Sequence, residues 1–290
     1  MPPRPRQPRR PQPSRLQPSR RQPSRRRKPK SPSSPDRRSA AAPGVFAVTS
    51  TPRRPRYGLA RVLSKRGLCS RSEAARWIEA GRVTVGGRRV YDAESPTLAD
   101  DPTIRIDGLA PVAPALRYFA LNKPRGLVTT AIDEHGRDTV YRCFDGAGLG
   151  WIAPAGRLDK ASEGLLLFGN DPAWAARLTD PATGPRKTYH VQIDALPEPS
   201  LLANLVEGVA SDGESLRVVS ATLLRSGGRT AWLEIVLDEG RNRQIRRLLS
   251  AFDIAVLRLV RVAIGGLALG ELGKGQWREL SAADLDAVWS

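Results

Sequence analysis

The chain has 290 residues, and its 47 Lys and Arg residues against 29 Asp and Glu residues give a formal net charge of +18. This length suggests two domains or one domain with additions, and so basic a balance indicates a polyanionic partner, most often nucleic acid. Two cysteines (Cys69 and Cys143) and two histidines exclude a disulfide-dense secreted scaffold and argue against a zinc site or a histidine-based triad. No apolar run approaches the roughly 20 residues of a membrane span, and no signal peptide is recognisable. We therefore expect a cytoplasmic, anion-binding protein without a metal, a cofactor or membrane contact.

The positive charge is concentrated in residues 1–56, which hold 17 Lys and Arg residues against one acid, together with 14 of the 25 prolines. Such a segment cannot bury enough apolar surface to offset its ordering entropy, so we expect a disordered basic arm. As a polybasic tether it would raise the affinity for RNA by counterion release, and as a solvated tail it would have no dedicated site; both interpretations stay open. An organelle transit peptide is disfavoured, because the frequent prolines forbid an amphipathic helix.

Residues 57–108 have the pattern of a small module that begins with two helices. Leu59, Val62 and Leu63 share one helical face, and Gly67 lies where this helix would end. After it we expect a helix from Ser72 to Gly81, a strand over 83–85, a hairpin turn at Gly86-Gly87, and strands over 88–90 and 104–108.

Basic residues gather in the first part of this module, which is either a solvated face or a surface for phosphates. We favour RNA contact and predict it for Lys65, Arg66, Arg71, Arg76, Arg82 and Arg88. The order of residues over 61–74 (RVLSKRGLCSRSEA) and 81–87 (GRVTVGG) resembles the S4 RNA-binding domain. The resemblance implies a domain that docks on structured RNA and carries no chemistry itself.

A short linker with Pro111 and Pro114 precedes a larger module, residues 117–290. Its strands outnumber its helices and do not alternate with them, which predicts an α+β fold on a mostly antiparallel, mixed sheet. No phosphate-binding P-loop and no dinucleotide-binding glycine motif is present, so any chemistry must come from side chains. We expect strands over 117–121, 126–130, 164–169, 187–193, 216–224, 230–237 and 255–262, and helices over 172–179, 200–207, 241–251 and 282–288.

Three polar segments of the larger module are candidates for a site: 156–164, 187–191 and 239–247. In the last of them, Arg243, Arg246 and Arg247 have the spacing of one helix face, and a basic face at a helix start suits a phosphate backbone. Each segment also has a simpler interpretation. Asp159 can cap a turn or pair with Arg157, Tyr189 can be an ordinary strand tyrosine, and the arginines can form a solvated face.

Taken together, the segments resemble the pseudouridine synthases of ribosomal RNA that carry an N-terminal S4 domain. The resemblance extends over about 57–290, and its markers are L-N-K-P-x-G at 121–126, G-R-L-D at 156–159, E-G-L-L at 163–166, K-T-Y at 187–189, E-G-R-N-R-Q-I-R-R at 239–247 and L-V-R at 259–261. It implies isomerisation of a uridine within the RNA, in which the N1 glycosidic link is replaced by a link at C5, without a cofactor.

By this resemblance, Asp159 is the catalytic carboxylate, and Arg246 pairs with it and holds it ionised and oriented. The target base must leave its stack, and Arg157 fills the space that it vacates. Tyr189 stacks on the extruded uracil and assists proton removal at C5.

The resemblance also implies that Leu259 packs against the base, although Leu257, two residues away, is an alternative for this role. Arg241, Arg243 and Arg247 are expected to contact the RNA backbone. The expected partner is large-subunit (23S) ribosomal RNA, free or in a pre-ribosomal particle, bound by a monomer. Small-subunit (16S) RNA is the alternative substrate, and a non-catalytic S4-type RNA-binding protein is the rival class.

Overall fold

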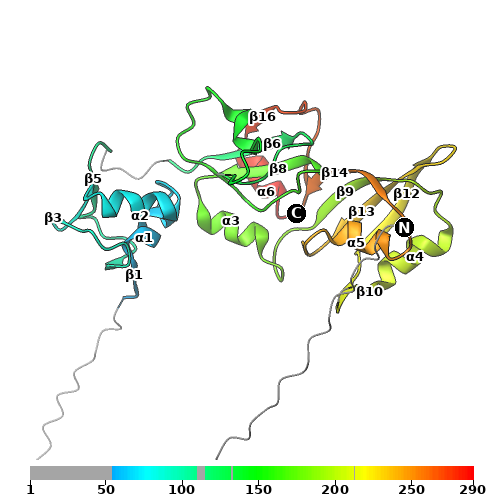
Figure 1. Ribbon diagram of the computed structural model, residues 1–290, viewed down its shortest axis with the longest axis horizontal. Coiled ribbons are helices and arrows are strands. Elements are labelled where there is room, and N and C mark those ends of the chain that lie inside the picture. Colours follow the sequence, from blue (N-terminus) through cyan, green and yellow to red (C-terminus); the bar gives the residue numbers. More distant parts are fainter. Residues whose placement is uncertain (1–53, 110–114, 132, 212) are drawn as a thin grey trace, which may run out of the picture. The chain divides into compact units, whose positions relative to one another are not determined.

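The computed structural model describes residues 54–109, 115–131, 133–211 and 213–290 (Figure 1). The predicted disordered arm, 1–56, lies outside these ranges except for its last three residues. Of these, Arg56 opens β1 (Arg56–Gly58), which pairs antiparallel with β4 (Pro96–Leu98). The folded part therefore includes the end of the expected arm.

No helix within those ranges is long and apolar enough to cross a membrane.

The small module consists of two helices, α1 (Leu59–Lys65) and α2 (Arg71–Glu79), and short strands. Gly67, with φ +70°, follows the end of α1 as predicted. The second helix begins earlier than the predicted Ser72, because the side chain of Ser70 accepts a hydrogen bond from the Glu73 amide at 3.1 Å and so caps it. The remaining strands form a sheet in the order β3 (Arg88–Arg89), β2 (Val83–Val85), β5 (Arg105–Ile106).

The larger module is built on a nine-stranded sheet with the strand path β12-β13-β9-β14-β8-β6-β16, to which β7 and β15 add (Figure 1). Every pair in it is antiparallel except β8 with β14. The predicted α+β fold on a mostly antiparallel sheet is therefore confirmed. The strands are β6 (Tyr118–Lys123), β7 (Ala153–Pro154), β8 (Glu163–Gly169), β9 (Lys187–Ile193), β12 (Ser220–Ser226), β13 (Ala231–Leu237), β14 (Val256–Ile264), β15 (Leu267–Ala268) and β16 (Trp277–Glu279).

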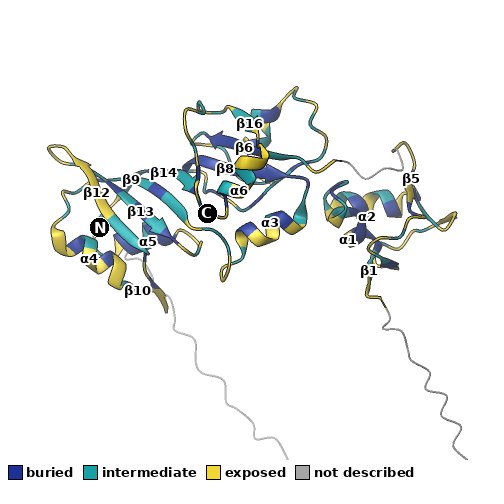
Figure 2. Ribbon diagram, turned by 180° about the vertical axis from the view of Figure 1, so that it is seen from behind, coloured by how far each residue is buried: buried dark blue, intermediate teal, exposed yellow. Residues whose placement is uncertain are grey.

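Two helices, α4 (Pro199–Glu207) and α5 (Gln244–Ser250), pack on the face of this sheet where every second residue of β13 is buried (Figure 2). Leu205 of α4 and Leu248 of α5 join Leu233 and Ile235 in the core. Asp171 caps α3 and Pro172 opens it, as predicted. The helices are α3 (Pro172–Thr179), α4 (Pro199–Glu207), α5 (Gln244–Ser250) and α6 (Ala282–Ala287), with a short 3₁₀ helix, η1 (Val140–Phe144), and a separate hairpin of β10 (Val209–Ser211) and β11 (Glu214–Leu216).

Two of the predicted strands are wrong. Residues 126–130 form a loop, because the chain turns at Gly126 (φ +102°) and then makes a single bridge from Val128 to Thr139. Residues 216–224 do not form one strand: Leu216 ends β11 in the separate hairpin, whereas β12 starts only at residue 220 in the large sheet.

Candidate active site

A cavity of about 570 Å³ in the larger module brings the three candidate segments together. Asp159 and Arg157 come from the loop before β8, Tyr189 from β9, Leu259 from β14, and Arg243 from the loop before α5. Strands β9 and β14 are neighbours in the sheet, and Leu259 of β14 lies opposite Val191 of β9. Residues far apart in the sequence thus line one cavity together with Asp159.

Lys123, for which no role was predicted, holds the Asp159 loop in position. The Lys123 side chain is fully buried, and its ammonium donates to the carbonyl oxygens of Asp159 (3.1 Å), Ser162 (2.8 Å) and Pro124 (3.2 Å). Burial lowers the pKa of Lys123 to about 8, and the nearby charge of Asp159 partly opposes this shift. Lys123 therefore sets the backbone position of the catalytic candidate without lining the cavity.

The loop that replaces the predicted strand 126–130 also supports Asp159. The Thr129 hydroxyl donates to the carbonyl oxygen of Leu158 at 2.7 Å, and the amide of Gly126 donates to that of Lys160 at 2.8 Å. Hydrogen bonds of this segment thus go to both neighbours of Asp159 instead of to a strand.

Asp159 forms an ion pair with Arg243, at 3.8 Å between Oδ2 and Nη1, whereas the predicted partner Arg246 forms no ion pair with it among the described residues but lies near enough for the two charges to interact. Arg246 donates instead to the carbonyl oxygens of Val256 (3.0 Å) and Ala161 (3.3 Å), so it supports the Asp159 loop from its far end. Burial and the charge of Arg243 lower the pKa of Arg246, while the charge of Asp159 raises it. The Arg243–Asp159 pair is long and half-exposed, so it contributes little stability and is easily exchanged for another partner.

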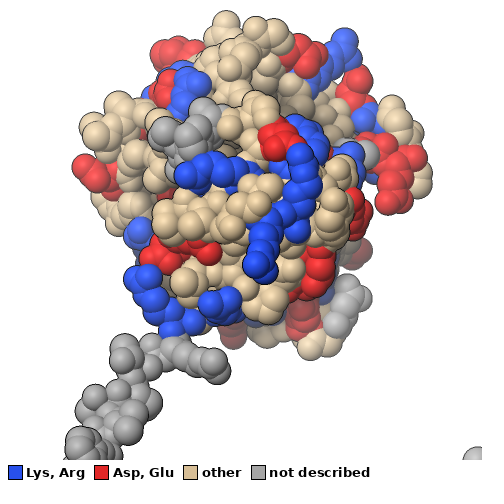
Figure 3. Space-filling view, turned by 90° about the vertical axis from the view of Figure 1, so that its left-hand side faces the viewer, with Lys and Arg blue, Asp and Glu red and all other residues tan. Residues whose placement is uncertain are grey.

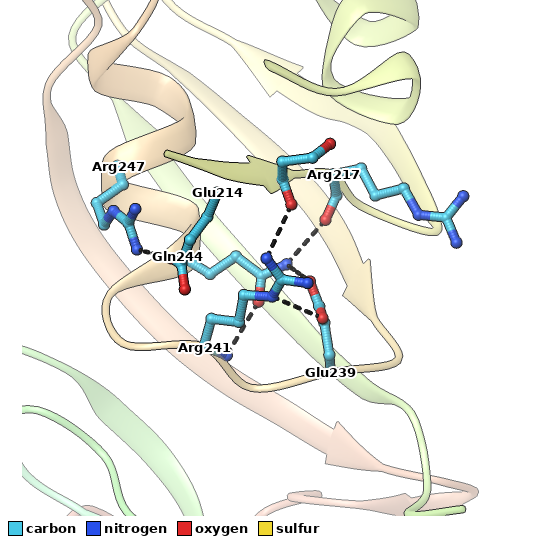
Figure 4. A network of polar contacts seen from close by, with 7 residues as sticks. Glu214, Arg217, Glu239, Arg241, Gln244 and Arg247 are labelled. Atoms are coloured by element: carbon cyan, nitrogen blue, oxygen red, sulfur yellow. Dashed lines mark hydrogen bonds and ion pairs between the residues drawn. The ribbon is translucent and has the colours of Figure 1, made fainter. Parts of the chain in front are cut away.

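A polar network holds the chain in front of α5 in place (Figure 4). The Arg241 side chain donates to Glu239 at 2.8 Å and to the Ser215 carbonyl oxygen at 3.0 Å. The buried Gln244 amide donates to Glu239 and to the Arg217 carbonyl oxygen, both at 2.9 Å. These contacts tie residues 239–244 to the segment around β11.

The network explains why the predicted helix 241–251 begins only at Gln244. Arg243 has φ +49°, a left-handed conformation that a helix cannot include and that arginine seldom adopts. Arg243 is therefore not part of the helix as predicted, although Arg243, Arg246 and Arg247 together line one pocket of about 390 Å³. Arg247 bonds to Glu214 (2.7 Å) and to the Ser211 carbonyl oxygen (2.8 Å). RNA contact by Arg241, Arg243 and Arg247 stays a prediction, for which Arg243 has the more open position.

Tyr189 and Leu259 lie on the paired strands β9 and β14, two positions apart in register, and both line the cavity, each less than a tenth exposed. Leu257 is excluded from this role. A register shift between Val256 and Arg258 places an extra residue there, and Leu257 is 38% exposed. Arg157 is exposed and lines both the main cavity and a second one of about 400 Å³ beside Asp159.

Figure 3 shows Lys and Arg side chains gathered in a band on one face of the molecule. In the small module, several of the predicted RNA-binding residues have partners within the module: Arg71 pairs with Glu94, Arg76 with Glu73, Arg82 lies over the Trp77 ring, and Lys65 lies over the Tyr57 ring.

Arg66 and Arg88, two of the predicted RNA-binding residues, have different surroundings. Arg66 donates to the carbonyl oxygens of Ala99 (3.0 Å) and Asp101 (2.7 Å), and burial lowers its pKa. Arg88 is exposed on β3. We therefore expect Arg66→Met to lower the free energy of unfolding of the small module by about 1–2 kcal/mol, and Arg88→Met to weaken RNA binding at unchanged stability. Thermal melting and RNA titration of both variants check this, and equal melting temperatures would contradict the role of Arg66.

Comparison with known proteins defines the class to which this fold and site belong. A family model described as RNA pseudouridylate synthase matches residues 117–251, and one described as the S4 domain matches residues 58–100. The chain therefore combines an RNA-binding domain with a catalytic domain of RNA-modifying isomerases.

Individual relatives cover both domains. Ribosomal large subunit pseudouridine synthase B of Salmonella typhimurium is 38% identical over 235 residues, which are 78% of this chain and 79% of that protein. An uncharacterised RNA pseudouridine synthase of Rickettsia prowazekii is 35% identical over 226 residues, 77% of this chain and 94% of that protein. A crystal structure of a pseudouridylate synthase, 29% identical, has a TM-score of 0.57 and covers 80% of this chain and 99% of its own. The chain belongs to the RNA pseudouridine synthase family.

Proposed function

We propose that this enzyme converts a specific uridine of large-subunit ribosomal RNA to pseudouridine, with Asp159 as the catalytic carboxylate. The observation that carries the proposal is the position of Asp159. Asp159 shares one cavity with Tyr189 and Leu259, and Lys123 and Arg246 hold its loop from two sides. The large-subunit substrate is suggested by the 38% identical relative from Salmonella typhimurium, whose name states that subunit.

The geometry suits an extruded base. Uracil would enter the cavity between Tyr189 and Leu259, and C1′ of its ribose would come to lie against Asp159. Arg157, exposed at the rim, is placed to fill the gap left in the RNA. Arg243 would leave its weak pair with Asp159 for a phosphate of the entering strand, since a surface ion pair of this kind costs little to break.

The S4 domain would dock the RNA, and the enzyme would act as a monomer in the cytoplasm, where ribosomal RNA is accessible. Mass-spectrometric mapping of pseudouridine in ribosomal RNA from a strain without this protein tests the substrate. We expect one uridine of the large-subunit RNA to remain unmodified. If the missing pseudouridine lay in small-subunit RNA instead, that RNA would be the substrate. An unchanged map of both RNAs would refute the proposed function.

A further inference from the structure

Arg261 lines the same cavity as Asp159 but has no part in the mechanism described above. It lies in β14 directly opposite Tyr189 of β9, and its side chain is only 6% exposed. Its Nε donates to the carbonyl oxygen of Leu165 at 2.7 Å. Its Nη2 is buried and has no hydrogen-bond partner within the described residues.

A buried guanidinium in this situation requires further acceptors. It is permanently charged and has five N–H groups, and leaving such groups unpaired away from water is costly. The described residues include no acid in an ion pair with Arg261. A bound ligand that presents an oxygen to the cavity would supply the missing acceptor.

The charges around Arg261 favour an acceptor-rich ligand. Lys187 lines the same cavity, and its pKa is lowered by burial and by the charge of Arg261, while the charge of Asp238 raises it. Asp180, one of the carboxylates that line the cavity, accepts from the amides of Ala182 and Thr183 in its own turn. Arg261 thus has a second cation near it, and its buried Nη2 lacks an acceptor among the described residues.

We propose that Arg261 selects uracil by donating a hydrogen bond to O4 of the extruded base while Tyr189 stacks on its ring. The inference rests on the proposed function and adds a determinant of base identity to it. Uracil and cytosine both carry O2, but cytosine has an amino group in place of O4. With cytosine, donors of the base would face donors of Arg261, and a site built to hydrogen-bond one group strongly rejects an analogue that lacks it.

A cycle of enzyme and substrate changes tests this role. Wild type and Arg261→Met each act on a synthetic RNA hairpin that carries uridine or 4-thiouridine at the target position. Sulfur accepts hydrogen bonds poorly, so we expect the thio substitution to lower kcat/KM of wild type about 10-fold, a loss typical of one hydrogen bond. Arg261→Met should lose about 10-fold on uridine and nothing further on 4-thiouridine. The cycle cancels the effect of sulfur on the chemistry itself.

The matched control is Arg258→Met, on the same strand. Arg258 forms an ion pair with Glu163 and is not among the lining residues of the cavity, so this variant should keep the wild-type response to 4-thiouridine. If Arg261→Met does not fold, Arg261→Gln retains a donor for the Leu165 oxygen and takes its place.

If Arg261→Met and the 4-thio substitution lowered kcat/KM independently of each other, the inference would be overturned. Coupling to 2-thiouridine instead of 4-thiouridine would also overturn it, because O2 does not distinguish the two bases. Failure of the proposed function has a different signature, since wild type would then convert none of the substrates.

Discussion

Asp159→Asn is expected to lower the rate of pseudouridine formation by at least about 1,000-fold and to leave RNA binding within a few fold of wild type. Asparagine keeps the shape of the side chain and removes the charge and the nucleophile. Because Lys123 holds the backbone oxygen of Asp159 and not its carboxylate, the loop should keep its position. The measurement is single-turnover conversion of target RNA, with binding followed separately by titration.

The matched control for this variant is Asp180→Asn, which changes a second carboxylate that lines the same cavity. Its oxygen accepts backbone amides, a role that the asparagine oxygen can fill. We expect a loss of less than about 10-fold. Wild-type conversion by Asp159→Asn, or equal losses in the two variants, would show that the reaction does not depend on this carboxylate.

Local turn and cap chemistry made much of the fold predictable. Gly86-Gly87 occupies a two-residue hairpin turn with positive φ at both positions, and Asp171-Pro172 opens α3 as expected. The three candidate segments line one cavity, and it was the order of their motifs that brought them together in the prediction. Periodicity alone left each of these segments with a simpler interpretation.

The features that were mispredicted depend on partners distant in the sequence. Residues 126–130 have the composition of a strand, but their hydrogen bonds go to the Asp159 loop. The extra residue at Leu257 reverses the alternation that had placed it on the inner face. Arg243 takes its rare conformation because Arg241 and Gln244 are fixed by the chain around β11. No local pattern reports any of these contacts.

Lys123→Met is expected to lower the free energy of unfolding at pH 7 by about 2–3 kcal/mol, because it leaves buried carbonyl oxygens without a donor. The deficit should widen at higher pH. The native protein releases the Lys123 proton near pH 8, whereas the unfolded chain retains it until about 10.5. Between these values the unfolded state binds more protons, so the stability of wild type rises with pH relative to the variant, by about 3 kcal/mol at most.

Denaturant unfolding of both proteins from pH 7 to pH 10.5 measures this difference. Lys160→Met, which removes an exposed lysine of the same loop, is the control and should change the stability by less than about 0.5 kcal/mol at every pH. A difference between wild type and Lys123→Met that stays constant over this range would mean that Lys123 is not buried as a charged group. A difference that widens would mean that burial of the charged Lys123, which holds the Asp159 loop, lowers the stability of the native protein. Such a loss of stability is expected where a fold positions a reacting group.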